Sequence, residues 1–117
     1  MLKNKEDRLF INLTPTEAFN FIKKHENDPN LIILDVRTPW EFSDGHIERA
    51  ENLDFTDPDF SEMVKKLDKD RIYIIYCKSG NRSKKVMELF RNFGFINLYS
   101  IKGGFEGWKS SNLNYEK

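Results

Sequence analysis

The stretch RIYIIYCKSGNRSKKVMELF, residues 71–90, joins a strand pattern to a helix pattern through a short segment that contains a glycine. RIYIIYC is an apolar run typical of a central strand that is covered on both faces. In the helix pattern, the residues expected to be buried are Val86, Leu89, Phe90 and Phe93, and Gly94 stands where a C-terminal cap belongs. The stretch therefore predicts a strand of a sheet followed by a helix that covers it.

The same alternation continues on both sides of this stretch. Further strands are predicted at FINL (10–13), LIILDV (31–36) and INLYSI (96–101). Helices are predicted at TPTEAFNFIKKH (14–25), at TPWE (38–41) and from Asp57-Pro58 onward, and GGFEGW (103–108) is predicted to be a tight turn. Such alternation indicates an α/β fold with three layers, in which helices cover both faces of a mainly parallel central sheet.

The bulk composition fits one globular domain over residues 1–117, with a core at about residues 8–109 and a polar, frayed tail from Ser110. Nineteen basic residues balance nineteen acidic ones, so the overall field favours neither nucleic acid nor an anionic membrane. No apolar stretch approaches the roughly 18 residues of a membrane span, and the start lacks a signal-peptide pattern. A single cysteine excludes an intrachain disulfide. We expect a cytoplasmic protein.

That single cysteine, Cys77, falls at the carboxyl end of the predicted central strand, where function sits in parallel sheets. A lone cysteine is usually an inert small hydrophobic residue. Here a helix begins a few residues later, and cations follow closely; both features stabilise a thiolate. Gly80 permits a positive φ, so backbone N–H groups can form an anion-binding nest, while Ser79 and Ser83 can donate further hydrogen bonds or cap the helix. We therefore interpret Cys77 as a nucleophile.

These residues resemble a known family. CKSGNRS (77–83) matches the C-x-x-G-x-R-S active loop of single-domain rhodaneses, the thiosulfate sulfurtransferases. LDVRTPWEFSDGHIERAENL (34–53) is similar to the family's upstream signature, and GGFEGW resembles its closing G-G-x-x-x-W element. Two departures are Glu48-Arg49, where the family has x-Gly before Ala50, and Asp54-Phe55, where it commonly has a hydrophobic residue and proline.

The resemblance implies a sulfurtransferase that carries sulfur as a persulfide on Cys77. The donor would be thiosulfate, and the acceptor cyanide, a cellular thiol, or a sulfur-relay or thioredoxin-like protein. No cofactor and no metal are implied. The substrate and the persulfide would be held by the loop residues Lys78, Ser79, Gly80, Asn81, Arg82 and Ser83.

Other polar residues are expected to support the site rather than react. Asp35 would hold the turn after its strand or face the site, and the spacing of Arg37 and Glu41 predicts a salt bridge across a helix start. Both Asp35 and Arg37 are thus possible supporting residues. His46 is expected to be a structural hydrogen-bonding residue, and His25 a helix C-terminal charge or cap.

Two other functions remain open from the sequence. Rhodanese-like domains also serve as non-catalytic binding or regulatory modules, although these often lack the cysteine. Phosphatases and arsenate reductases use a C-x5-R loop, whereas Cys77 and Arg82 form a shorter C-x4-R loop that suits a single sulfur atom better than a tetrahedral oxyanion. Mercaptopyruvate enzymes begin their loop with C-G, which Lys78 does not match, so thiosulfate is the preferred donor.

Overall fold

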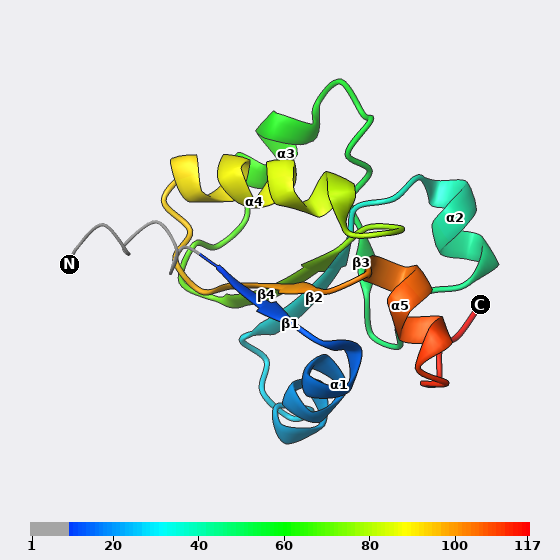
Figure 1. The fold of residues 1–117 in the computed structure, drawn as a ribbon. Helices are drawn as coiled ribbons and strands as arrows, with labels where there is room; N and C mark the ends of the chain where they lie inside the picture. The colour runs from blue at the N-terminus through cyan, green and yellow to red at the C-terminus, as the bar shows by residue number, and fades with distance from the viewer. Residues whose placement is uncertain (1–9) are drawn as a thin grey trace.

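Strands and helices alternate along residues 10–117, the part of the chain that this computed structural model describes (Figure 1). The strands of this part are β1 (Ile11–Leu13), β2 (Leu31–Asp35), β3 (Glu51–Asn52), β4 (Ile72–Tyr76) and β5 (Leu98–Ile101). Its helices are α1 (Pro15–Lys24), α2 (Pro39–Asp44), α3 (Phe60–Lys65), α4 (Asn81–Asn92) and α5 (Gly104–Ser110). The α/β class is confirmed. Residues 8 and 9, with which the predicted core begins, lie outside the described part.

The strands form one sheet in the order β1-β5-β4-β2-β3, and every neighbouring pair is parallel. β4 is central, as predicted. It pairs with β2 from Leu31↔Ile72 to Asp35↔Tyr76, and with β5 on its other side. Because all strands run in the same direction, the segments that leave their carboxyl ends meet along one edge of the sheet.

Helices cover both faces of this sheet, which confirms the three layers. α3 and α4 lie on one face and α1 on the other, while α5 lies near the carboxyl edge (Figure 1). Successive residues of β4 point to opposite faces. Tyr73 and Ile75 belong to the apolar cluster under α3 and α4, and Ile74 and Tyr76 belong to the cluster formed with α1 and α5.

Local capping signals account for two helix starts but not for a third. The capping boxes of α1 and α2, led by Thr14 and Thr38, are both present. The predicted start of α3 at Asp57-Pro58 is wrong, because the helix begins at Phe60. The Asp57 carboxylate accepts a hydrogen bond from the Asp59 N–H at 2.8 Å and closes a turn ahead of the helix.

The segment between the central strand and the next helix is short, as predicted. β4 ends at Tyr76 and α4 begins at Asn81, so the connecting loop is residues 77–80. Val86 and Phe90 are buried as predicted, Met87 is buried as well, and Leu89 and Phe93 are only half-buried. Gly94, directly after the helix, has a φ of 97°.

GGFEGW is a helix, not the predicted tight turn. Gly103 and Gly104 have φ values of 78° and 60° and reverse the chain after β5, and α5 follows at once. Phe105 and Trp108, three residues apart, lie on the buried side of α5 and pack into the core on the α1 face. The glycines provide the turn, and the two aromatic residues stabilise the helix.

The C-terminal tail is not frayed, contrary to expectation. His46 and Glu116 exchange two main-chain hydrogen bonds of 2.8 and 2.9 Å. The Trp108 indole N–H donates to the Asn114 carbonyl at 2.9 Å, and the Tyr115 ring meets Phe105 edge-on at 5.3 Å. Main-chain pairing therefore holds the tail as far as Glu116, which the polar composition of the tail does not reveal.

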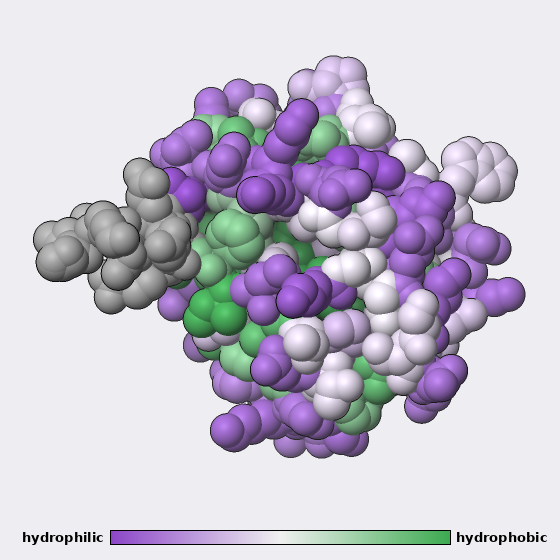
Figure 2. Space-filling model, in the orientation of Figure 1, coloured by the Kyte–Doolittle hydropathy of each residue, from purple (hydrophilic) through white to green (hydrophobic). Residues whose placement is uncertain are grey.

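The surface between the helix layers is partly apolar. Figure 2 shows hydrophobic residues gathered between α4 and α1, near the edge strand β1, on an otherwise largely hydrophilic face. Ile11 of β1 is 51% exposed. Within residues 10–117, no helix has both the length and the apolar character that crossing a membrane requires.

Candidate active site

Cys77 stands at the carboxyl edge of the sheet, directly after the central strand. Its side chain is 1% exposed and belongs to the apolar cluster on the α4 face. On the neighbouring strand, the Val36 N–H donates to the Tyr76 carbonyl at 3.0 Å and extends the β2–β4 pairing up to the cysteine. The sulfur is therefore held by the most buried part of the sheet.

The loop after Cys77 turns its backbone toward the sulfur. Gly80 has a φ of 98°, and its N–H donates to the Cys77 Sγ at 3.1 Å. Gly80 is also the N-cap of α4 and supplies no capping side chain. The thiol thus lies beside the N-terminus of α4, a helix of twelve residues. A helix N-terminus carries a partial positive charge, which attracts negatively charged groups to this position.

α5 fixes the orientation of this loop from the other side. The Phe105 N–H donates to the Cys77 carbonyl at 2.8 Å, and the Glu106 N–H donates to the Lys78 carbonyl at 2.9 Å. In a trans peptide the N–H points opposite to the C=O, so the amides of Lys78 and Ser79 point away from α5. Sequence reasoning missed this clamp. The pair Gly103-Gly104 was its one visible signal.

Gly104 makes this close approach possible. A Cβ at this position would lie 2.5 Å from the Cys77 carbonyl oxygen and 2.8 Å from the Lys78 carbonyl oxygen. Its φ of 60° is also one that glycine adopts without strain. Only glycine lets the start of α5 lie against the Cys77 loop.

The remaining predicted site residues lie in the loop after Cys77 and in the first turn of α4. Lys78 and Ser79 are exposed loop residues, and Lys78 Nζ lies 4.0 Å from the Glu106 carboxylate. Asn81, Arg82 and Ser83 form the first turn of α4, with Arg82 half-buried. The buried Ser83 hydroxyl donates to the Gly80 carbonyl at 3.1 Å, so it braces the loop and helix start instead of donating to the sulfur.

Asp35 and Arg37 form a buried ion pair under the turn that follows β2. The guanidinium donates to both carboxylate oxygens, with the shortest contact 2.6 Å, and also to the Gly45 carbonyl at 2.6 Å. Its Cζ lies 4.3 Å from the centre of the Phe105 ring. Burial opposes the charge, but the hydrogen bonds and charge of Asp35 outweigh it and raise the pKa of Arg37. The pair therefore ties β2 and α2 to α5.

The predicted salt bridge between Arg37 and Glu41 is wrong. The Glu41 carboxylate accepts instead from the backbone N–H of Thr38 at 3.0 Å, as part of the capping box of α2. Arg37 precedes that helix at a bend in the chain, where both its backbone N–H and its guanidinium donate to the Asp35 carboxylate.

The two histidines have structural contacts, as expected. His46 Nδ1 lies 2.8 Å from the Phe42 carbonyl oxygen, and its ring stacks on Phe42 with centroids 3.8 Å apart. His25 is the C-cap of α1, and its Nδ1 lies 2.8 Å from the Phe21 carbonyl oxygen. In both cases the ring nitrogen lies within hydrogen-bond distance of the carbonyl oxygen four residues back, in the helix that precedes the histidine.

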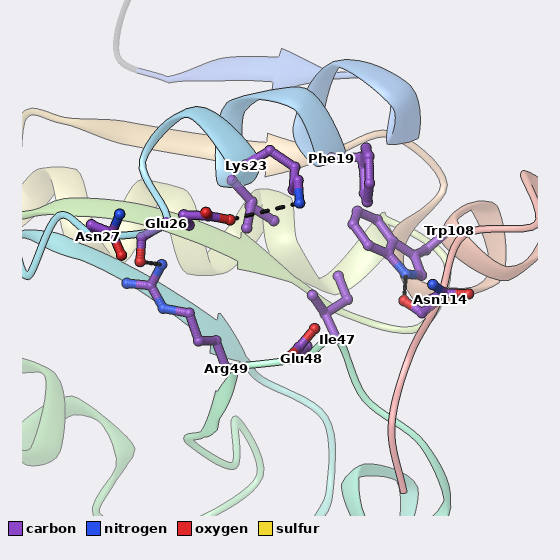
Figure 3. Close-up of a pocket in the computed structure, with 10 residues that line it drawn as sticks. Phe19, Lys23, Glu26, Asn27, Ile47, Glu48, Arg49, Trp108 and Asn114 are labelled. Carbon is purple, nitrogen blue, oxygen red and sulfur yellow. Dashed lines mark hydrogen bonds and ion pairs between the residues drawn. The ribbon is translucent and has the colours of Figure 1, made fainter.

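Two small cavities flank the Cys77 loop. A cavity of about 240 Å³ lies between Ser79, Gly80 and the start of α4 on one side and the β5–α5 turn on the other. A second, of about 210 Å³, lies between α2, Lys78 and α5. A larger cavity of about 480 Å³ is formed by α1, residues 47–49 and Trp108, and neither Cys77 nor its loop lines it (Figure 3). Cys77 itself is buried and lines none of these three cavities, whereas its loop residues line the two smaller ones.

Comparisons with known proteins agree with this fold. A family model described as the rhodanese-like domain matches residues 19–111. The thiosulfate sulfurtransferase GlpE of Actinobacillus succinogenes is 32% identical over 107 residues, which cover 92% of this chain and 91% of that protein. A rhodanese-related protein from Thermoplasma volcanium superposes with a TM-score of 0.77 at 25% identity, covering 91% of this chain and 97% of the other. A rhodanese-like domain protein from Staphylococcus aureus gives 0.73 at 30% identity, covering 92% and 99%.

Proposed function

This chain belongs to the rhodanese-like domain family, and from that premise we propose that it is a sulfurtransferase with Cys77 as the sulfur carrier. The observation that carries the proposal is the Cys77 thiol at the N-terminus of α4, with the Gly80 N–H 3.1 Å from its sulfur. The similar GlpE protein is named a thiosulfate sulfurtransferase, which supports thiosulfate as the donor. No cofactor takes part.

The proposed reaction has two displacement steps. In the first, the Cys77 thiolate attacks the outer sulfur of thiosulfate; the S–S bond of the donor breaks, and sulfite leaves with the bonding electron pair. The product is a persulfide on Cys77. In the second, cyanide or a thiolate attacks the outer sulfur of the persulfide and takes it, and Cys77 leaves as the thiolate. Each step forms one bond to sulfur and breaks one, so no external oxidant or reductant is needed.

The loop residues have distinct roles in this proposal. The Gly80 N–H and the start of α4 stabilise negative charge on the sulfur, first as thiolate and then as persulfide. Arg82 and Lys78 attract the doubly charged donor, and Ser83 keeps Gly80 in place through its hydroxyl. Asp35 and Arg37 support the neighbouring turn and do not react.

The test is sulfur transfer by the purified protein. Incubation with thiosulfate should add the mass of one sulfur atom to the intact chain, and added cyanide should remove it as thiocyanate. Cys77→Ser should show neither the mass gain nor thiocyanate formation. The same assay distinguishes the alternatives: a non-catalytic module would form no adduct, and a phosphatase would hydrolyse an aryl phosphate instead. An active Cys77→Ser protein would refute the proposal.

A further inference from the structure

The carboxyl edge of the sheet places Cys77 between two surfaces of different chemistry. The strands lie side by side in the order β5-β4-β2, and all are parallel. The segments that follow them must therefore lie in that order: Lys102 after β5, Cys77 after β4, and α2 with Trp40 after β2. The order puts Lys102 on the β5 side of Cys77, and α2, which carries Trp40, on the β2 side.

The first surface, called here the cationic flank, consists of Arg82, Lys84, Lys85 and Lys102. Within residues 10–117 none of these four forms an ion pair. Glu88 is the sole acidic residue of α4. The 240 Å³ cavity opens between Lys84 and Lys102 beside the Cys77 loop. Although the whole chain has no net charge, this flank attracts carboxylates.

The second surface is Trp40, called here the aromatic flank. Its side chain is 87% exposed, the most exposed large hydrophobic residue in the described part of the chain. The capping box of Thr38 and Glu41 fixes the start of α2, so the ring is carried on an ordered helix. An exposed tryptophan on a rigid element is the type of side chain that most often anchors a protein contact.

Both flanks lie within reach of one bound polypeptide. Val36 is hydrogen-bonded to Tyr76, next to Cys77, and Trp40 is four residues further along the chain. At about 3.5 Å per residue and about 5 Å between strands, Trp40 lies within about 20 Å of Cys77. A standard protein interface of about 800 Å² per partner is roughly 30 Å across. A polypeptide that brings a thiol to Cys77 therefore covers both flanks.

We propose that the sulfur acceptor is a polypeptide thiol with carboxylates on the side that meets the cationic flank and an apolar side chain on the side that meets Trp40. This inference rests on the sulfurtransferase function proposed above. The acceptor thiolate attacks the outer sulfur of the Cys77 persulfide, the S–S bond breaks, and Cys77 leaves as the thiolate. The acceptor keeps the sulfur as its own persulfide, so the transfer involves no net oxidation.

Three synthetic peptides with one central cysteine test this preference. The first has glutamates on one side and leucines on the other; the second replaces the glutamates by lysines, and the third replaces the leucines by serines. The protein is first loaded with thiosulfate and the persulfide verified by mass. Its transfer rate to each peptide is then divided by the rate to mercaptoethanol. We expect the first peptide to be preferred about tenfold over each of the others at low ionic strength. The preference over the lysine peptide should shrink at about 0.5 M salt.

Variants connect the preference to the two flanks. Trp40→Ala should remove the preference for leucine, and Lys102→Glu should weaken the preference for glutamate. Ile96→Ala is the matched control, because Ile96 is 72% exposed but precedes β5 at the opposite edge of the sheet. It should change neither ratio.

The outcomes separate the two proposals. If thiosulfate adds no sulfur, the proposed function is wrong and this inference falls with it. If the persulfide forms but the three peptides react equally, only the acceptor inference is overturned, and small thiols are the acceptors. Equal slowing of the peptide and mercaptoethanol reactions in Trp40→Ala would also overturn it, because Trp40 would then act on the chemistry rather than on docking.

Discussion

At the scale of single residues, the Cys77 loop depends on a glycine outside it. Gly104→Ala would place a methyl group 2.5 Å from the Cys77 carbonyl oxygen, at a φ of 60°. α5 must then withdraw, and the hydrogen bonds from Phe105 and Glu106 to the loop carbonyls are lost. We expect a destabilisation of about 2–4 kcal/mol and slower persulfide formation. Urea unfolding and the rate of sulfur loading by thiosulfate measure the two effects.

Gly94→Ala provides the control for this prediction. Gly94 also has a positive φ, 97°, but a Cβ there would meet only the flexible Lys69 side chain at 3.5 Å. It should lose about 1 kcal/mol through backbone strain and load sulfur at the normal rate. If Gly104→Ala also loaded sulfur at the normal rate, α5 would not be needed to hold the loop.

At the scale of elements, the sequence predicts what local signals determine. The capping boxes at Thr14 and Thr38 lie within four residues, and the apolar run of β4 identifies the central strand by itself. In the same way, the position of Cys77 and Gly80 directly after the central strand could be predicted from the loop sequence alone. The position of this loop is therefore a property of one short segment of the chain.

Elements held by distant contacts could not be predicted in this way. α5 has seven residues and two glycines at its start, so its stability comes from packing Phe105 and Trp108 against the α1 face. The clamp on the Cys77 carbonyl and the pairing of His46 with Glu116 join segments far apart in the chain. Arg37 was matched with Glu41 because helical spacing was assumed for a residue that precedes its helix.

Arg49 combines an unfavourable backbone angle with hydrogen bonds that join it to the segment after α1. It has a φ of 79° at the position where the family pattern has glycine. Its guanidinium donates to the Leu31 carbonyl at 2.9 Å and to the carbonyls of His25, Glu26 and Asp28 at 3.4 Å, after the end of α1. A cation is favourable near a helix C-terminus. These bonds offset the unfavourable backbone angle.

Two substitutions separate the strain from the bonds. Arg49→Ala loses the guanidinium but keeps the positive φ, so it should reduce the free energy of unfolding by about 1 kcal/mol. Arg49→Gly loses the same bonds but relieves the strain, so it should be about 1 kcal/mol more stable than Arg49→Ala. Urea unfolding of the three proteins measures both differences. Equal stability of the glycine and alanine variants would mean that residue 49 carries no strain.

At the scale of the whole molecule, two tyrosines of the central strand make the stability of both apolar clusters depend on pH. Tyr73 lies in the cluster under α4 and Tyr76 in the cluster with α1. Burial raises the pKa of Tyr76 far above its ordinary value of 10.0, and the Asp35 carboxylate raises it further. Burial, and then the charge of Asp68, also raise the pKa of Tyr73. Both cores therefore favour the neutral phenol.

The raised pKa values of the two tyrosines predict that the folded protein loses stability at alkaline pH. Below about pH 10 both tyrosines are protonated in the folded and unfolded chains, so their contribution to stability is fully present. Above pH 10 the unfolded chain releases protons that the folded chain keeps, and the free energy of unfolding should fall by up to about 1.4 kcal/mol per pH unit for each tyrosine. Urea unfolding between pH 9 and about 11.5 gives this slope.

The variant Tyr76→Phe tests the assignment to Tyr76. It also loses the hydrogen bond from the Ile47 N–H, so the slope rather than the absolute stability is compared. The Tyr76→Phe slope should be shallower by about one tyrosine's share. A slope equal to that of the unmodified protein would mean that Tyr76 titrates in the folded state as it does in the unfolded chain, and that the central strand is open to water at high pH.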